Sequence, residues 1–272
     1  MSTEIYSNRY FNKMINIKSE KEIETLREGG RKLAYIVKTL VDECKNGTSS
    51  FYLNEKAGEL MVKEGGEPSF LNYTPYGAGR PFPGNICISV NHEIVHGIPN
   101  EEEKIFKNGD IVTIDVGLVY KGLFTDHAHT LIIGPEGPQK KEKRKLLKAT
   151  KEALYSGIKE AKPGNTIGDI GFAIQKIAKK YDLGIAEGLT GHGVGYGVHE
   201  NPYVPNYGQQ GQGEKLIEGM VIAIEPMFTL GKGRIITEPN GYTYSTKDGS
   251  LSAQFEHTVA ITKRGPLILT EL

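Results

Sequence analysis

The chain has 272 residues, and its 33 Lys and Arg residues balance 33 Asp and Glu residues, so the formal net charge is zero. This balance argues against nucleic-acid and anionic-membrane partners, because both attract an excess of basic side chains. The two cysteines, Cys44 and Cys87, lack the spacing of a zinc knuckle or a disulfide framework. The sequence shows neither a secretory signal nor an apolar run long enough to span a membrane. We therefore expect a cytoplasmic protein with no membrane partner and no sequence-specific nucleic-acid partner.

The first half of the chain begins with two helical patterns. Ser19 and Glu22 have the spacing of a capping box, and apolar residues then recur at helical intervals until Asn46-Gly47. A second, shorter helix is expected from about Leu53 to Lys63. Strand patterns follow at residues 86–90, 111–120 and 123–133, with Lys121-Gly122 as the turn between the last two.

The same order of elements returns in the second half. Helical patterns cover Lys140–Glu160 and Ile167–Tyr181, and strand patterns follow at residues 220–224, 234–237, 242–245 and 253–262. The order of two helices followed by strands occurs twice, which predicts two similar halves around one central sheet. No linker rich in Pro or Ser separates the halves, so we expect one domain of the α+β class.

Acidic residues within strand-like apolar runs are the main functional signal. A carboxylate is almost never buried without a partner, because its desolvation costs several kcal/mol or forces protonation. A single buried acid would suggest an arginine partner or a protonated state, but no arginine lies in these runs. A cluster of such acids instead favours a metal site. The acids are Asp115 in IVTIDVGLV, Asp126 in GLFTDHAHTLII, Glu225 in VIAIEPMF and Glu256 in SAQFEHTVAIT.

Strand geometry brings the first two acids together. If Lys121-Gly122 is a two-residue turn, Asp115 faces Ala128, and Asp126 lies two residues from that pair on the same face. A turn at Tyr120-Lys121 would place the two carboxylates directly opposite each other. Both registers leave both carboxylates within reach of one shared ion.

The histidines divide by their surroundings. His192 lies in GHGVGYG, where glycines allow the backbone to approach a ligand closely and leave one imidazole protruding. A nucleotide-binding loop is the alternative, but the third glycine of that pattern is replaced by Tyr196. His96 and His199 lie at turn-like edges from which they can reach a substrate. Alternation with the neighbouring acids turns three further histidines away from the metal site: His127, His129 and His257.

Charge balance predicts the number of metal ions. Four carboxylates and one neutral imidazole carry four negative charges, which two divalent cations neutralise. Paired metals are a standard arrangement for hydrolysing amides and phosphate esters. Ligands that are mostly oxygen suit Mn(II) or Fe(II) at least as well as Zn(II).

Together these motifs resemble the methionine aminopeptidases, in their short bacterial form. The resemblance runs from about Ile17 onward and rests on VNHEIVHGIP, GDIVTIDVG, TGHGVGYGVHENP, GMVIAIEPM and SLSAQFEHT. It implies an α+β pita-bread fold, with a central antiparallel sheet, flanking helix pairs and pseudo-twofold halves. It also implies an N-terminal extension at residues 1–16 and a single metallopeptidase catalytic domain at residues 17–272.

The resemblance further implies roles for individual residues. Asp115 would bind one metal, Asp126 and Glu256 would bridge the pair, and His192 with Glu225 would complete the other site. The two divalent ions, Mn, Fe, Co or Zn, would activate a hydroxide that attacks the scissile carbonyl.

Other residues would act on the substrate. Glu225 would accept a proton, His199 would donate to the developing oxyanion, and His96 would position the substrate amide. Cys87 and Tyr242 match positions of the side-chain pocket. The substrate would be a peptide or the N-terminus of a nascent protein with a small second residue. A monomer is expected, with the ribosome as a further partner.

The sequence departs from the family pattern around the pocket. Val198 replaces a frequent Phe, the chain contains no Trp, and the segment Thr74–Gly84 is several residues longer than in the short bacterial form. Tyr73, Tyr76 and Phe82 therefore remain unassigned. The alternatives are a broader or proline-related aminopeptidase, a non-catalytic pita-bread binding protein, and a two-metal phosphatase.

Overall fold

The computed structural model describes residues 14–75 and 77–272. The predicted N-terminal extension at residues 1–16 therefore lies almost entirely outside the described residues. Within the described part of the chain, no helix is long and apolar enough to cross a membrane.

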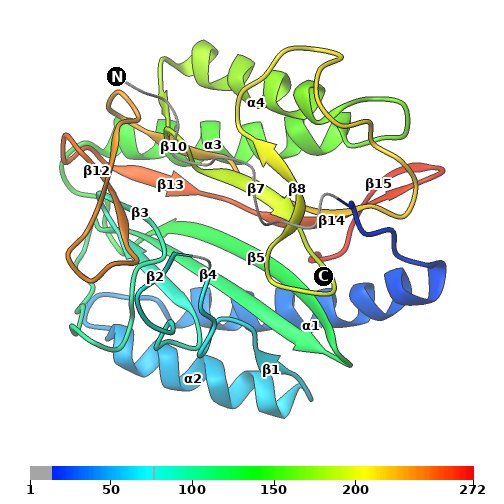
Figure 1. Ribbon diagram of the computed structural model, residues 1–272. Helices are drawn as coiled ribbons and strands as arrows, with labels where there is room; N and C mark the ends of the chain where they lie inside the picture. The colour runs from blue at the N-terminus through cyan, green and yellow to red at the C-terminus, as the bar shows by residue number, and fades with distance from the viewer. Residues whose placement is uncertain (1–13, 76) are drawn as a thin grey trace.

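Two helices cover the strands of the first half (Figure 1). Helix α1 (Glu20–Glu43) begins at Ser19, whose side chain forms the predicted capping box with Glu22. Helix α2 (Ser50–Lys63) begins three residues before its expected start, because Ser49 caps it by accepting a hydrogen bond from the Phe51 N–H. The strands of this half are β1 (Glu67–Pro68), β2 (Cys87–Val90), β3 (Glu93–Val95), β4 (Ile111–Tyr120) and β5 (Leu123–Ile132).

The second half repeats this arrangement on the other side of the molecule (Figure 1). Helices α3 (Lys140–Glu160) and α4 (Ile167–Tyr181) have the predicted bounds. The strands of this half are β6 (Gly184–Ile185), β7 (Thr190–Gly193), β8 (Glu200–Pro205), β9 (Val221–Ile224), β10 (Met227–Thr229), β11 (Ile235–Thr237), β12 (Tyr244–Thr246), β13 (Ser252–Gln254), β14 (His257–Thr262) and β15 (Gly265–Ile268).

All strand pairs are antiparallel, and they form several connected sheets. In the first half, β4 pairs with β5 along its whole length. It also pairs with β2 at residues 112–115 and with β1 at residues 118–119. In the second half, the order is β15-β14-β9-β7-β8. Two smaller sheets, β13-β10-β6 and β11-β12-β3, complete the set within the described residues.

Side-chain hydroxyls join the two halves where β5 meets β13 and β14. Thr258 accepts a hydrogen bond from the Asp126 N–H at 2.8 Å and donates to the Asp126 carbonyl at 2.7 Å. Thr130 likewise accepts from the Gln254 N–H at 3.1 Å and donates to the Gln254 carbonyl. The central layer therefore stays continuous although no main-chain ladder crosses this seam.

The single strand predicted at 253–262 is wrong. It is divided at Phe255 and Glu256, so that β13 pairs with β10 while β14 pairs with β9. The Glu256 N–H donates instead to the Ala128 carbonyl of β5 at 3.0 Å. The break turns the chain from one sheet to another at the position of an acid.

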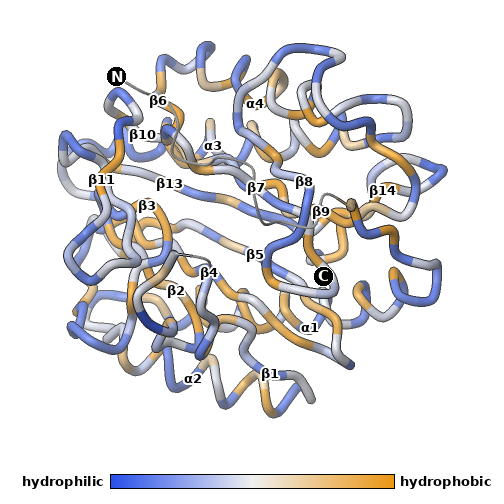
Figure 2. Tube along the Cα trace, viewed as in Figure 1, coloured by the Kyte–Doolittle hydropathy of each residue, from blue (hydrophilic) through white to orange (hydrophobic). Residues whose placement is uncertain are grey.

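Each half has its own hydrophobic core. One core packs α1 and α2 against β2 and β4, with Leu33, Leu40 and Ile114 at its centre. The other packs α3 and α4 against β9 and β14, and includes Ile170 and Ile222. Figure 2 shows the hydrophobic residues gathered between helices and strands, while the outer loops are mostly hydrophilic. The two cores hold the strands between them as a rigid platform.

Candidate metal centre

The hairpin β4–β5 presents two of the predicted acids. Asp115 pairs with Ala128 and Gly117 pairs with Asp126, which is the register of a two-residue turn at Lys121-Gly122. Asp115 and Asp126 are therefore diagonal neighbours on one face of the hairpin. The prediction from the two-residue turn is confirmed.

Three further predicted residues reach the same place from the second half. Glu256 lies at the break between β13 and β14, beside β5, because its N–H is bonded to Ala128. Glu225 directly follows β9, and His192 lies in β7, paired with Ala223 of β9. The site therefore lies at the seam between the two halves.

These residues form a set that could hold a metal ion. One ligand atom each from Asp126, His192 and Glu256 lie within 4.8 Å of one another. Oδ1 of Asp115 and Oε1 of Glu256 are buried and have no hydrogen-bond partner among the described residues. A buried, unpartnered carboxylate oxygen carries a full desolvation penalty, which a cation would remove. The donor set therefore fits divalent metal ions.

Burial and mutual repulsion disfavour ionisation of the four acids in the metal-free protein. Burial raises the pKa of Asp115 to about 7. Burial, followed by repulsion from neighbouring acids, raises the pKa values of Asp126, Glu225 and Glu256 well above their usual range. Among the described residues, none of the four acids forms an ion pair with Lys or Arg. Positive charge at this site must come from bound cations or from protons.

His192 is oriented as a metal ligand. Its Nδ1 lies 2.9 Å from the Gly193 carbonyl, an acceptor, so Nδ1 carries the proton and Nε2 keeps its lone pair. Burial lowers its pKa to about 4, so the ring is neutral at pH 7. Nε2 points at the site, 3.5 Å from Oε1 of Glu225.

The glycines beside His192 act differently from the sequence expectation. A Cβ on Gly191 would lie 2.3 Å from the Ala223 carbonyl, and one on Gly193 would lie 2.2 Å from the Asn201 carbonyl. These glycines allow β7 to approach its neighbouring strands, rather than a ligand. The GHGVGYG segment thus begins as a strand, which its glycines concealed in the sequence.

The two predicted substrate-facing histidines lie near His192. The His199 ring packs edge-on against the His192 ring, with centroids 4.5 Å apart. His96 directly follows β3 with a φ of 56°, and its ring lies 5.7 Å from Tyr244. Burial lowers the pKa of His96 to about 4 and that of His199 well below its usual range. Both rings are therefore neutral hydrogen-bonding groups at pH 7.

Two residues that the sequence analysis did not assign support this site. The Tyr73 hydroxyl lies 3.0 Å from Nδ1 of His199. The Gln254 side chain donates to Oε2 of Glu225 at 3.1 Å. Gln254 lies two residues before Glu256 in the SAQFEH segment, so alternation along that strand was the available signal. Tyr73 gave no such signal, because its contact joins distant segments.

The rings of the three histidines excluded from the metal shell contact other groups, although Nδ1 of His127 lies 2.5 Å from the main-chain carbonyl of Glu256. The His127 ring stacks on the His257 ring at 4.7 Å, with an angle of 6° between them. His129 packs edge-on against Phe255. None of the three belongs to the metal-binding set found among the described residues.

An apolar pocket wall adjoins the metal centre. Cys87 pairs with Asp115 across β2 and β4, and it packs in a cluster with Tyr242. Burial raises the pKa of the Cys87 thiol, so no thiolate competes with the carboxylates. A hollow of about 340 Å³ borders this cluster. The other members of the cluster are Phe70, Phe82, Ile98 and Val198, with Tyr73, Ala78 and Phe124 partly buried around them.

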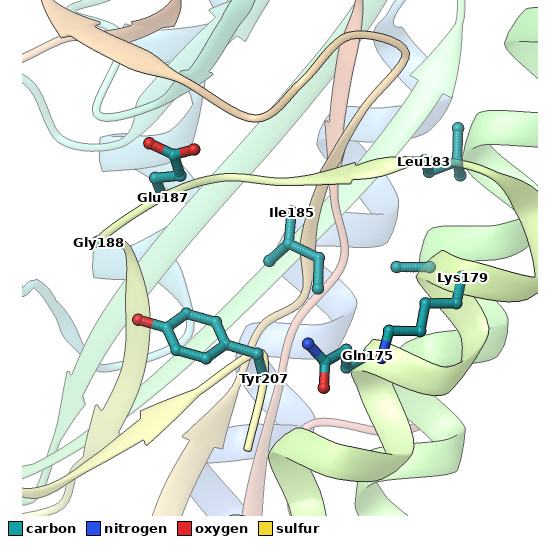
Figure 3. Close-up of a pocket in the computed structure, with 8 residues that line it drawn as sticks. Gln175, Lys179, Leu183, Ile185, Glu187, Gly188 and Tyr207 are labelled. Atoms are coloured by element: carbon teal, nitrogen blue, oxygen red, sulfur yellow. The ribbon is translucent and has the colours of Figure 1, made fainter. Parts of the chain in front are cut away.

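A second hollow lies between α4 and the segment around β6 (Figure 3). It also has a volume of about 340 Å³, and its lining includes Lys179, Glu187 and Tyr207. None of the predicted site residues lines it. The acid cluster therefore remains the candidate centre of chemistry.

Comparison with known proteins identifies the class. The profile of metallopeptidase family M24 matches residues 24–263. The chain belongs to this family.

Within it, the chain groups with the methionine aminopeptidases. It is 45% identical to the methionine aminopeptidase of Aquifex aeolicus over 260 residues, which is 95% of this chain and 99% of the relative. The crystal structure of methionine aminopeptidase from Rickettsia prowazekii matches with a TM-score of 0.89 at 37% identity, covering 95% of this chain and 100% of that one. These likenesses confirm the α+β pita-bread fold and a metal-dependent aminopeptidase.

Prolidases share the fold less closely. The prolidase of Pyrococcus horikoshii matches with a TM-score of 0.69 at 28% identity, and the match covers 94% of this chain but 63% of the prolidase. More than a third of the prolidase therefore has no counterpart in this chain.

Proposed function

We propose that this chain is a methionyl aminopeptidase that removes initiator methionine from nascent proteins whose second residue is small. Residues 17–272 act in this proposal as a single catalytic domain. The proposal also includes a cytoplasmic location, a monomeric chain and contact with the ribosome. The observation that carries it is the buried cluster of four acids that no Lys or Arg side chain of the described residues compensates.

Two divalent ions are proposed, because four carboxylates and one neutral imidazole match their charge. When bound, the ions would polarise the scissile carbonyl and supply hydroxide at neutral pH. Mn, Fe, Co and Zn are the candidate metals. The proposed ligands are Asp115, Asp126, His192, Glu225 and Glu256.

The residues around the metals would handle the substrate. Glu225 would accept a proton, since its Oε1 faces the site while Gln254 holds its Oε2. His199 would donate a hydrogen bond to the developing oxyanion through Nε2. The Tyr73 hydroxyl would favour the tautomer that this requires, because a phenol that donates to Nδ1 leaves the ring proton on Nε2. His96 would hold the substrate amide.

The apolar cluster beside the metals would receive the methionine side chain. Cys87 and Tyr242 would form part of this pocket, and Phe82 would add a further wall, since all three belong to the cluster. Val198, which directly precedes His199, links this pocket to the catalytic histidine.

Metal titration tests the proposal directly. Calorimetric titration of Mn(II) into chelator-stripped protein should show two ions per chain. Glu256→Gln, which removes a bridging charge, should weaken both binding events. Binding of a single ion in the wild-type protein, or unchanged binding in the variant, would contradict the dinuclear site.

A further inference from the structure

Residues 77–84 lie beside the apolar pocket, within the segment Thr74–Gly84 that the sequence resemblance marks as longer than the family pattern. Its base is held by two main-chain hydrogen bonds of 2.9 Å, from the Phe82 N–H to the Tyr73 carbonyl and from the Asn72 N–H to the Phe82 carbonyl. Phe82 and Ala78 project from it into the pocket cluster. The segment thus supplies part of the pocket wall.

Arg80 connects this loop to two other loops. Its guanidinium donates to both carboxylate oxygens of Glu101, with Nη2 2.7 Å from Oε2. The same Nη2 donates to the Asn240 carbonyl at 3.2 Å. The backbone carbonyl of Arg80 accepts a hydrogen bond from the Tyr242 hydroxyl. One residue therefore holds three segments that are distant in the sequence.

The loop contacted by Arg80 carries the other pocket wall. Oδ1 of Asn240 accepts from the N–H groups of Tyr242 and Thr243, both at 2.9 Å. The Tyr242 ring packs edge-on against the Phe82 ring at 5.2 Å. The Thr243 hydroxyl donates to the His96 carbonyl at 3.2 Å. Arg80 thus contacts the pocket wall directly through Tyr242, and its side chain reaches His96 in three steps, through Asn240 and Thr243.

We propose that Arg80 is a positioning residue that sets the distance between Phe82 and Tyr242, and so the width of the side-chain pocket. This inference rests on the proposed function, because it takes the cluster to be the site of the methionine side chain. Tyr242 precedes β12, which begins at Tyr244, so no sheet ladder fixes its ring. The Arg80 side chain supplies that constraint through the Asn240 carbonyl and through its guanidinium, which lies 6.0 Å from the centroid of the Tyr242 ring.

The solvent exposure of the Arg80–Glu101 ion pair indicates which measurement would detect its loss. The Arg80 side chain is 42% exposed and that of Glu101 is 39% exposed. Exposed ion pairs contribute little to global stability, since water screens them. Loss of the contact should therefore change substrate recognition much more than the melting temperature.

Arg80→Ala tests this with a matched control. The KM for Met-Ala-Ser should rise about 3- to 10-fold, a loss smaller than or similar to that of one methylene contact in an apolar pocket. The preference for Met-Ala-Ser over Leu-Ala-Ser should fall by a similar factor, with kcat within about twofold of wild type. Arg144→Ala is the control. Arg144 also forms an ion pair with a carboxylate, that of Glu136, but neither residue belongs to the pocket cluster.

A double-mutant cycle separates the contact from general perturbation. Glu101→Ala should reproduce part of the Arg80→Ala effect, and the double variant should be no worse than Arg80→Ala alone. Arg80→Lys should restore KM only partly, because an ammonium cannot replace the planar fork. Wild-type KM and selectivity in Arg80→Ala would overturn the proposal.

Hydrogen exchange keeps the test independent of activity. Arg80→Ala should speed amide exchange in peptides covering 77–84 and 240–243, whereas Arg144→Ala should not. If no methionine peptide is cleaved by the wild type, the proposed function fails, and this measurement still decides whether Arg80 holds the two loops. Unchanged exchange in both segments would overturn the role of Arg80.

Discussion

At the scale of single residues, the buried acids link metal binding to the stability of the protein. Asp115 has a folded-state pKa of about 7 against an ordinary value of 3.8, because burial disfavours its charge. Burial also raises the pKa values of Asp126, Glu225 and Glu256 well above their usual range. Between about pH 6.5 and pH 8 the unfolded chain has already lost these protons, while Asp115 of the folded metal-free chain loses its proton within this range.

The sign of the pH effect follows from this difference. Because the unfolded state binds fewer protons, the free energy of unfolding of the metal-free protein should decrease from about pH 6.5 to pH 8, as the pH rises through the folded-state pKa of Asp115. Buried histidines such as His192 act in the opposite direction only below their ordinary pKa of 6.5. Thermal melts of chelator-stripped protein check this. A melting temperature that rises across this pH range would contradict the raised pKa values of the acids. Added metal should make the melting temperature less dependent on pH.

Removing one metal ligand should stop turnover without unfolding the protein. Asp115→Asn keeps the shape of the side chain but removes a charge that the proposed metals need, so kcat should fall below detection. The fold should persist, because the neutral amide removes the charge repulsion of Asp115 on Asp126 and Glu256. Asp42→Asn on the exposed face of α1 is the control. Wild-type turnover in Asp115→Asn would remove this residue from the ligand set.

His199 is expected to act on the rate. His199→Ala should lower kcat by about 10²–10³-fold, the cost of losing one oxyanion donor, with a smaller change in KM. Steady-state kinetics on Met-Ala-Ser measure both values, and the exposed His92→Ala serves as control. A kcat equal to that of the control would exclude the donor role.

Residue-scale prediction succeeded where local geometry decides position. The pairing of Asp115 with Ala128 followed from one turn, because side chains on a strand alternate. The contact of Tyr73 with His199 could not be predicted, since 126 residues separate them and no periodic pattern relates them.

At the scale of elements, helix ends were predictable because capping is local. The capping box at Ser19 and the bounds of α3 and α4 were all read correctly from the sequence. The break at Glu256 was not, because an alternating pattern runs through it unchanged. Its cause is tertiary: Ala128 of β5 takes the hydrogen bond that a continuous strand would have used.

Close packing of α1 gives a prediction for this element. A Cβ on Gly30 would lie 2.3 Å from the Leu269 carbonyl oxygen. Gly30→Ala should lower the free energy of unfolding by about 1–3 kcal/mol, because overpacking exceeds the ~1 kcal/mol that alanine adds to a helix. Urea unfolding measures this. Arg31→Ala, exposed on the same helix, should change stability by less than about 0.5 kcal/mol. A stabilised Gly30→Ala variant would contradict the packing.

At the scale of the whole molecule, the repeated order of elements predicted the two halves correctly. The central layer is divided into several sheets: β3 of the first half pairs with β12 of the second, whereas at the β5 seam Thr130 and Thr258 join the halves through side-chain hydroxyls. This seam brings acids from both halves together. The hairpin within the first half predicted that Asp115 and Asp126 lie together, whereas no local pattern showed that Glu225 and Glu256 of the second half join them.

Substrate cleavage after metal removal tests the central claim most directly. Chelator-stripped protein would be given Mn(II), Co(II), Fe(II) or Zn(II) singly and assayed on Met-Ala-Ser, Met-Leu-Ser and Leu-Ala-Ser. We predict metal-dependent release of methionine from Met-Ala-Ser alone. Cleavage of all three peptides would contradict the methionine and small-residue selectivity, and no cleavage with any bound metal would contradict the aminopeptidase itself.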